Sequence, residues 1–172
     1  VDRHGGAEGE GGGAVGTEVR SAGTGETRPG LRGIGRRAIV AGGGDSHRLD
    51  LSQMVMIKEN HIAEMGLQTA VESFRERASF ATKIEVEAES TEQAKQAATA
   101  GADIILLDNM TPAETEDAVD ALGDTDGDVL TEASGGITVD DVADYAATGV
   151  DIISMGSLTH SAPSLDFSFR TG

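Results

Sequence analysis

The sequence predicts an α/β fold, in the form of an open parallel α/β barrel of the TIM-barrel type that is incomplete at its N-terminal end. The clearest evidence is residues 83–109, which have the pattern of a strand, a helix and a second strand. Two strands joined through a helix lie parallel, with a right-handed crossover. From residue 54 onwards, five strand-like apolar runs alternate with four helical patterns. A polar or glycine residue follows each run, which is typical of the rim of such a barrel.

Length and composition narrow the class of protein. The chain has 172 residues, enough for one domain with a core but short for a full eight-unit barrel. It has no Cys, which excludes disulfide and thiolate chemistry. It also has no run of 18 apolar residues and no basic-then-apolar start. We therefore expect a cytoplasmic protein that does not act at a membrane.

The charge is strongly acidic and unevenly placed. Acidic residues number 30 against 13 Lys plus Arg, for a formal net charge of −17. Residues 1–53 hold seven Arg and seven acidic residues, so the whole excess lies in residues 54–172. A nucleic-acid partner is not expected, because a phosphate backbone would be repelled. Such an acidic surface suits a salt-rich cytoplasm and predicts a halophilic protein.

The first part of the chain has the weakest pattern. Residues 1–22 contain seven Gly and no helical or strand period, so they cannot bury enough apolar surface to offset ordering entropy. We expect residues 1–22 to be disordered or degenerate and assign residues 23–172 to the barrel domain. Pro29 and the apolar residues after it predict a short helix that stops at the glycines of residues 42–44. These glycines lack the spacing of a nucleotide motif, so a flexible connector is the favoured interpretation.

From residue 54 the elements are clear. Residues 54–57 form an apolar run before Lys58, and the helical spacing from Leu67 to Ala78 follows it. In the central unit, Ser90 is placed to cap a helix, Gly101 to end it, and residues 104–107 lead to Asp108. The remaining predicted elements are a helix from Thr111 to Gly123, a strand through Val129 and Leu130, a helix over 139–146, a strand over 150–154 and a short segment at 165–169.

Three charged residues are predicted to meet at one edge of the sheet. Lys58, Glu87 and Asp108 each follow or end a strand, and the carboxyl ends of parallel strands share an edge. Taken singly, Asp108 could equally cap the next turn and Glu87 could be a solvated strand end. Two Gly/Ser turns, 134–136 and 156–157, precede helices and offer backbone N–H groups to a phosphate. Together these strand ends predict a site for a phosphorylated sugar.

Longer motifs keep both order and spacing: PGLR at 29–32, GGGDSHR at 42–48, MVMIKENHI at 54–62, KIEVE at 83–87, AGADIILLDN at 100–109, EASGGI at 132–137 and DIISMGSLTHSAPSLDFS at 151–168. On these motifs the chain resembles quinolinate phosphoribosyltransferase over about residues 23–170. The resemblance implies transfer of phosphoribose from phosphoribosyl pyrophosphate to quinolinate, with loss of carbon dioxide and pyrophosphate, to give nicotinate mononucleotide for NAD synthesis. It also implies Mg²⁺, no organic cofactor, and a homodimer or higher homo-oligomer.

The resemblance also implies roles for individual residues. Glu87 and Asp108 match the acidic pair near the ribose and the metal, bound directly or indirectly, and with Lys58 they form the catalytic set. Asn60, His61 and His160 lie in matching motifs but are expected to be structural. His47, Arg48 and Lys58 match basic residues around quinolinate and the donor, whereas Ser134, Gly135, Gly136, Gly156 and Ser157 fall in the phosphate-holding turns.

Two departures from the family pattern bear on activity. The N-terminal sandwich domain of the family has no counterpart in this sequence. The family's Thr-Arg-Lys-Thr segment aligns with residues 24–27, where Gly25 and Glu26 replace the Arg and the Lys. We therefore expect weak or absent activity from this chain alone. The alternatives are a related phosphoribosyltransferase with another acceptor, and a non-catalytic barrel-only interaction subunit.

Overall fold

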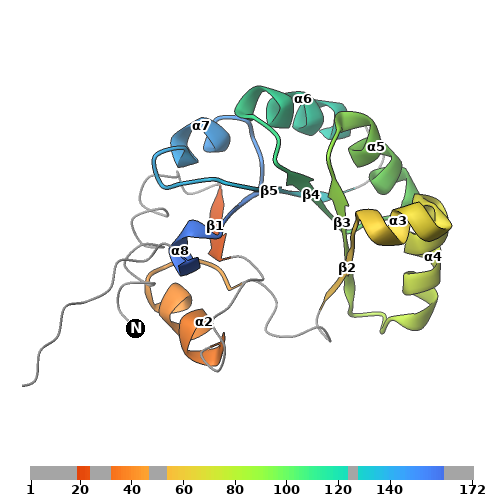
Figure 1. Ribbon diagram of the computed structural model, residues 1–172, viewed down its shortest axis with the longest axis horizontal. Helices are drawn as coiled ribbons and strands as arrows, with labels where there is room; N and C mark the ends of the chain where they lie inside the picture. Colours follow the sequence, from red (N-terminus) through yellow and green to blue (C-terminus); the bar gives the residue numbers. More distant parts are fainter. Residues whose placement is uncertain (1–18, 24–31, 47–53, 124–127, 161–172) are drawn as a thin grey trace, which may run out of the picture.

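The computed structural model describes residues 19–23, 32–46, 54–123 and 128–160, and its centre is a six-stranded parallel sheet. The strand order is β1-β6-β5-β4-β3-β2, and within these ranges the two edge strands do not pair with each other (Figure 1). The predicted parallel α/β architecture is confirmed, and the barrel is open. The strands are β1 (Arg20–Gly23), β2 (Met54–Ile57), β3 (Lys83–Ala88), β4 (Ile104–Asp108), β5 (Leu130–Ser134) and β6 (Ile152–Met155).

The helices lie outside the sheet, and α3 to α7 form an arc along it in Figure 1. Every predicted helix is present in the described ranges, whereas α3 and α8 were not predicted. None of the described helices has the length and apolar content to cross a membrane. The helices are α2 (Arg32–Ala41), α3 (Glu59–Met65), α4 (Leu67–Arg77), α5 (Thr91–Ala100), α6 (Pro112–Gly123), α7 (Val142–Ala146) and α8 (Ser157–His160).

The capping residues set the helix ends as the sequence indicates. Ser90 Oγ accepts a hydrogen bond from Gln93 N at 3.3 Å, and Gly101 adopts the left-handed conformation, with φ of 90°, after α5. At α6, Thr111 Oγ1 accepts from Glu114 N at 3.4 Å, and Glu114 Oε2 accepts from Thr111 N at 2.8 Å. This reciprocal pair is a capping box, and it fixes where the chain turns after β4.

The prediction of disorder for residues 1–22 was wrong for residues 20–22. These residues belong to β1, which pairs in parallel with β6, and Ser21 O accepts a hydrogen bond from Asp45 N at 2.8 Å. The strand is held by backbone pairing and by the burial of small side chains, so it has no apolar alternation to detect. Residues 1–18 lie outside the described part of the chain.

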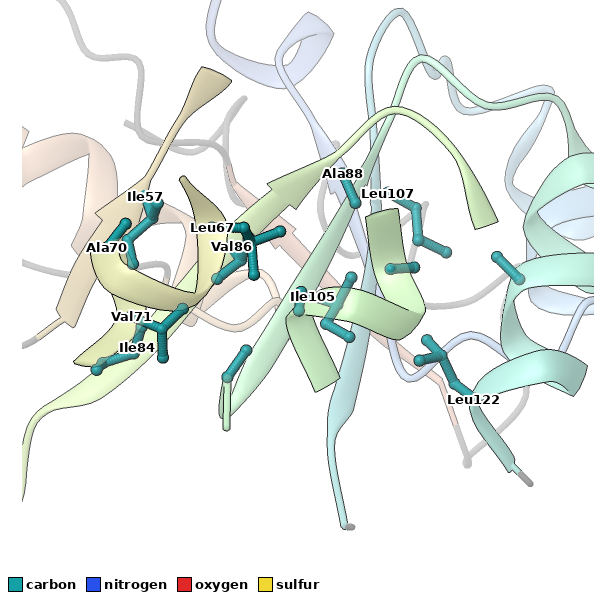
Figure 2. Close-up of a cluster of buried hydrophobic side chains, with 14 of the residues drawn as sticks. Ile57, Leu67, Ala70, Val71, Ile84, Val86, Ala88, Ile105, Leu107 and Leu122 are labelled. Carbon is teal, nitrogen blue, oxygen red and sulfur yellow. The ribbon is translucent and has the colours of Figure 1, made fainter. Parts of the chain in front are cut away.

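The two faces of the sheet differ in chemistry. One face packs on the helices: Ile57, Ile84, Val86, Ile105 and Leu107 join residues of α4, α5 and α6 in a single apolar core (Figure 2). Side chains alternate between faces along each strand. The opposite face therefore carries the intervening residues. Glu85 and Glu87 of β3 lie on that face rather than against the helices. A second apolar cluster covers the sheet near β6 and α7.

Register places several polar side chains on this opposite face. Glu87 pairs with Leu106, Leu106 with Glu132, and Glu132 with Ile152, so these four residues form one row. Asp108 lies two residues beyond Leu106, one row closer to the carboxyl edge. The interior side of the open barrel is consequently acidic, and the rows nearest its carboxyl edge hold the candidate site.

Candidate active site

Lys58 and Glu87 form an ion pair at the carboxyl edge of β2 and β3. Lys58 Nζ lies 2.7 Å from Glu87 Oε2, and their side chains are 54% and 16% exposed. The contact is electrostatic, because within the described ranges Glu87 Oε2 is buried and has no hydrogen bond of good geometry. The sequence pattern predicts Glu87 at a strand end, but β3 continues to Ala88. Glu87 is therefore mostly buried, and its side chain lies on the interior face of the sheet.

Asp108 stands beside this pair at the end of β4. Burial and the nearby charge of Glu87 raise the pKa of Asp108, and a hydrogen bond from Asn109 and the charge of Lys58 oppose that rise. Asn109 Nδ2 donates this bond to Asp108 Oδ2 at 2.7 Å. Two carboxylates and a single ammonium thus share one place, and the local field favours an additional positive charge. The structure therefore brings together the three residues predicted to be catalytic.

The first predicted phosphate turn adjoins Asp108. Asp108 pairs with Ser134 in the ladder, and Asn109 N donates to Ser134 O at 2.9 Å. Gly135 and Gly136 both have positive φ, 105° and 66°. A Cβ on Gly135 would lie 2.4 Å from Asn109 Oδ1, so only glycine fits at this position. The turn consequently presents its backbone directly next to the acidic pair.

The second predicted turn follows β6. Gly156 lies between β6 and α8, and Ser157 Oγ donates to Ile137 O at 3.2 Å. This bond joins the turn after β6 to the loop that follows Gly136. The two glycine turns are therefore linked to each other in the described structure, although the Ser157 hydroxyl proton is directed to the protein backbone.

A buried pair of carboxyl groups, Glu85 and Glu132, lies on the same face of the sheet as the site, and the sequence pattern did not predict it. Glu85 and Glu132 are 0% and 3% exposed and lie close enough to interact, and Ser154 Oγ donates to Glu132 Oε1 at 2.5 Å. Burial raises the pKa of Glu132, and the interactions with Ser154 and Glu85 oppose that rise. Around Glu85, apolar and acidic residues alternate, as they also do on a strand with one face exposed to solvent. The sequence pattern therefore does not distinguish this buried pair from solvent-exposed carboxylates.

The remaining predicted residues separate into structural and undescribed ones. His61 Nδ1 accepts from Lys58 N at 3.2 Å, and the His61 ring meets Phe74 edge-on at 5.6 Å, so His61 anchors the start of α3. Asn60 lies on the same helix. His47 and Arg48 fall outside the described residues, as does the side chain of His160.

Comparisons with known proteins show which family this chain is similar to. The family model "Quinolinate phosphoribosyl transferase, C-terminal domain" matches residues 12–170. The human carboxylating nicotinate-nucleotide pyrophosphorylase is 45% identical over 150 residues, which cover 87% of this chain and 50% of that protein. The probable enzyme of the same name from Methanothermobacter thermautotrophicus is 47% identical over 161 residues, covering 91% and 57%.

A solved structure shows the same arrangement of the chain. The crystal structure of NadC from Streptococcus pyogenes superposes with a TM-score of 0.87 at 37% identity, covering 98% of this chain and 59% of that one. In all three comparisons the match takes in between 50% and 59% of the other protein. The chain thus spans about half the length of the curated relatives it matches.

Proposed function

Because the chain belongs to the quinolinate phosphoribosyltransferase family, we propose that it carries the site at which phosphoribose passes from phosphoribosyl pyrophosphate to quinolinate. The products are nicotinate mononucleotide, carbon dioxide and pyrophosphate, as in NAD biosynthesis. The observation that carries the proposal is the meeting of Lys58, Glu87 and Asp108 beside the Ser134–Gly136 turn.

Each group has a role that suits its chemistry. Glu87 and Asp108 provide the negative field that stabilises positive charge developing on the ribose as pyrophosphate departs. Glu87 is paired with Lys58 through its buried Oε2, and its other carboxylate oxygen accepts from a ribose hydroxyl. Lys58, half exposed at the edge, binds a carboxylate or phosphate oxygen of the substrates. The backbone of the glycine turns holds the phosphate, and His47 and Arg48 are assigned to the dianionic acceptor.

A magnesium ion fits the acidic pair. Mg²⁺ prefers oxygen ligands, keeps several waters and is usually held by one or two carboxylates plus substrate phosphates. Among the described side chains no group of three His, Cys, Asp or Glu gathers as a self-sufficient metal site. Asp108 and Glu87 would therefore hold the ion together with the diphosphate of the donor. When bound, the ion neutralises charge on the departing pyrophosphate.

The site also has a setting in a larger assembly. The relatives are about twice as long as the matched region. We assign the chain to a homodimer or higher homo-oligomer in the cytoplasm, with no nucleic-acid partner. The net charge of −17 supports a halophilic setting.

The test combines donor binding with product formation. Phosphoribosyl pyrophosphate with Mg²⁺ is titrated calorimetrically into the chain, into Lys58→Met and into Lys95→Met, whose lysine lies exposed on α5. Loss of a charged hydrogen bond should weaken binding about 10- to 100-fold in Lys58→Met. Lys95→Met, the matched control, should bind like the parent chain.

Product formation separates the alternatives. Nicotinate mononucleotide is assayed for the chain and for Gly25→Arg with Glu26→Lys, which restores the two cations of the family motif. Turnover that rises with the repair supports the proposed acceptor. Donor binding without turnover of quinolinate, even in the repaired variant with the sandwich domain of a relative supplied, indicates another acceptor, and absence of donor binding indicates a non-catalytic barrel.

A further inference from the structure

Asn109 has an unusual backbone conformation directly after Asp108. Its φ is 55°, and among the described residues it is the single non-glycine residue with positive φ. L-residues avoid this region, although Asn tolerates it better than most. A conformation of this kind persists only where the surrounding structure imposes it, and such positions cluster at functional sites.

The backbone around Asn109 is held from two sides. Asn109 N donates to Ser134 O at 2.9 Å, and Tyr145 Oη, on α7, donates to the neighbouring Met110 O at 2.7 Å. Met110 is buried, and Thr111 begins the capping box of α6. The chain is therefore fixed on both sides of Asn109, and the direction of its side chain is determined by the fold.

The side-chain amide lies between Asp108 and the glycine turn. A carboxylate only accepts hydrogen bonds, so the amide directs Nδ2 to Asp108 Oδ2, at 2.7 Å, and Oδ1 toward Gly135. A Cβ on Gly135 would come within 2.4 Å of Asn109 Oδ1 and 2.7 Å of Asn109 N. Asn109 thus contacts the Asp108 carboxylate on one side. On the other side it leaves no room for a side chain in place of Gly135.

We propose that Asn109 is a positioning residue that holds the Asp108 carboxylate and the Ser134–Gly136 turn in one fixed arrangement. This inference rests on the proposed function, because the two groups that Asn109 joins are the ones assigned to the ribose and phosphate parts of the donor. Fixing their separation before binding removes the cost of ordering them when the donor arrives. Asn109 itself need not touch the substrate.

Three substitutions separate this role from a merely structural one. Asn109→Gly keeps the positive φ and the backbone bond to Ser134 but removes the amide. Asn109→Asp keeps the shape and tolerance of positive φ but cannot donate, and it places a second carboxylate against Asp108. Asn109→Ala removes the amide and also strains the backbone. Asn109→Gly should therefore be about as stable as the parent chain, and Asn109→Ala less stable. All three variants should lose the fixed arrangement of Asp108 and the Ser134–Gly136 turn.

The experiment measures unfolding by urea, the crystal structure of Asn109→Gly, and calorimetric affinity for phosphoribosyl pyrophosphate with Mg²⁺. We expect Asn109→Gly to keep parental stability, to release Asp108 or the turn from its present position, and to bind the donor about 10- to 100-fold more weakly. Asn109→Asp should bind no better than Asn109→Gly, because it restores the shape without the donor group.

Two other results discriminate the inference from the proposed function. If Asp108 and the Ser134–Gly136 turn stay in place in Asn109→Gly, the positioning role is overturned, whatever the donor does. If they shift but the parent chain fails to bind phosphoribosyl pyrophosphate, the positioning role stands and the proposed function fails. Donor affinity that falls only in proportion to lost stability across the three variants would also overturn the positioning role.

Discussion

Carboxylates at the two edges of the sheet have opposite surroundings. At the amino edge, Asp103 accepts from Arg75 Nη2 at 2.8 Å, from Ile84 N at 2.8 Å and from Lys83 Nζ at 3.4 Å. Burial would raise the pKa of Asp103, but these bonds and charges outweigh it and lower the pKa. At the carboxyl edge, burial and a neighbouring carboxylate raise the pKa of Asp108.

A second aspartate follows the amino-edge pattern. Asp151 Oδ2 accepts from both Thr131 N, at 2.8 Å, and Thr131 Oγ1, at 2.9 Å, and so joins the start of β6 to β5. Asp103 similarly joins the start of β4 to β3. Amino-edge carboxylates have their acceptors filled by the protein and tie strands together, whereas carboxyl-edge ones retain capacity for a ligand. Parallel barrels generally divide stability and function between their edges in this way.

The largest effect should come from removing charge at the carboxyl edge. Asp108→Asn keeps the shape but deletes one of the two charges proposed to stabilise the transition state. In the chain repaired with Gly25→Arg and Glu26→Lys, turnover to nicotinate mononucleotide should fall about 10²- to 10³-fold, while thermal stability stays level or rises because repulsion from Glu87 is relieved. The measurements are the rate of product formation and the melting temperature. A stability loss as large as that of an amino-edge variant would break the contrast between the edges.

The same change at the amino edge should act on stability instead. Asp103→Asn removes two partly exposed ion pairs, each contributing about 0–1 kcal/mol, and weakens a bond to Ile84 N, so the free energy of unfolding should fall by about 1–2 kcal/mol. A lowered folded pKa gives stability that is present above the unfolded value of about 3.8 and lost as pH falls through the folded value. Urea unfolding should therefore show the two proteins converging in acid. Unaltered donor affinity in Asp103→Asn completes the comparison.

The buried pair Glu85 and Glu132 is an intermediate case between the two edges. The folded pKa of Glu132 is raised, so its stabilising contribution is full below the unfolded value of about 4.5 and is lost as pH rises through the higher folded value. Glu132→Gln keeps an acceptor for Ser154 and removes that pH dependence. Its melting temperature at neutral pH should rise by about 2–4 °C, corresponding to about 1 kcal/mol. A drop at neutral pH would show that the carboxyl pair stabilises the fold as it is.

The sequence predicted the elements whose periodicity is strong. β2 to β6 and the helices α2, α4, α5, α6 and α7 follow from apolar spacing, caps and glycine stops. α3 was missed because none of its residues is buried, so Glu59–Met65 has no apolar stripe. β1 was missed because Ser21 and Ala22 are small and are held by pairing with β6 rather than by an apolar alternation.

The site was predictable as far as topology determines it. Lys58, Glu87 and Asp108 follow from the rule that parallel strands share a carboxyl edge, and their meeting needs no further information. The Glu85–Glu132 pair depends on which face of the sheet curves inward, and the φ of Asn109 depends on tertiary contacts with Ser134 and Tyr145. Neither feature has a signal in local sequence, because both arise from packing between distant segments.

The smallest expected effect is that of salt on the melting temperature. Salt acts on the charges at both edges and on those of the whole surface. Residues 54–172 hold six basic and 23 acidic groups, so repulsion dominates at low ionic strength. Salt shortens the screening length from about 10 Å at 0.1 M to about 3 Å at 1 M. It also weakens the partly exposed Arg75–Asp103 pair, but exposed pairs contribute only about 0–1 kcal/mol. The melting temperature should therefore rise between dilute buffer and molar KCl.

Asp103→Asn and Asp108→Asn give this measurement a matched pair, because each removes one negative charge from the same chain. Asp103→Asn deletes an attraction that salt would have weakened, so its melting temperature should rise more steeply with KCl than that of the parent. Asp108→Asn deletes a repulsion from Glu87 that salt would have relieved, so its rise should be shallower. A flat or falling parental curve would contradict the halophilic interpretation. Equal slopes in the two variants would show instead that the charges at the two edges are screened alike, since net charge alone would then set the response.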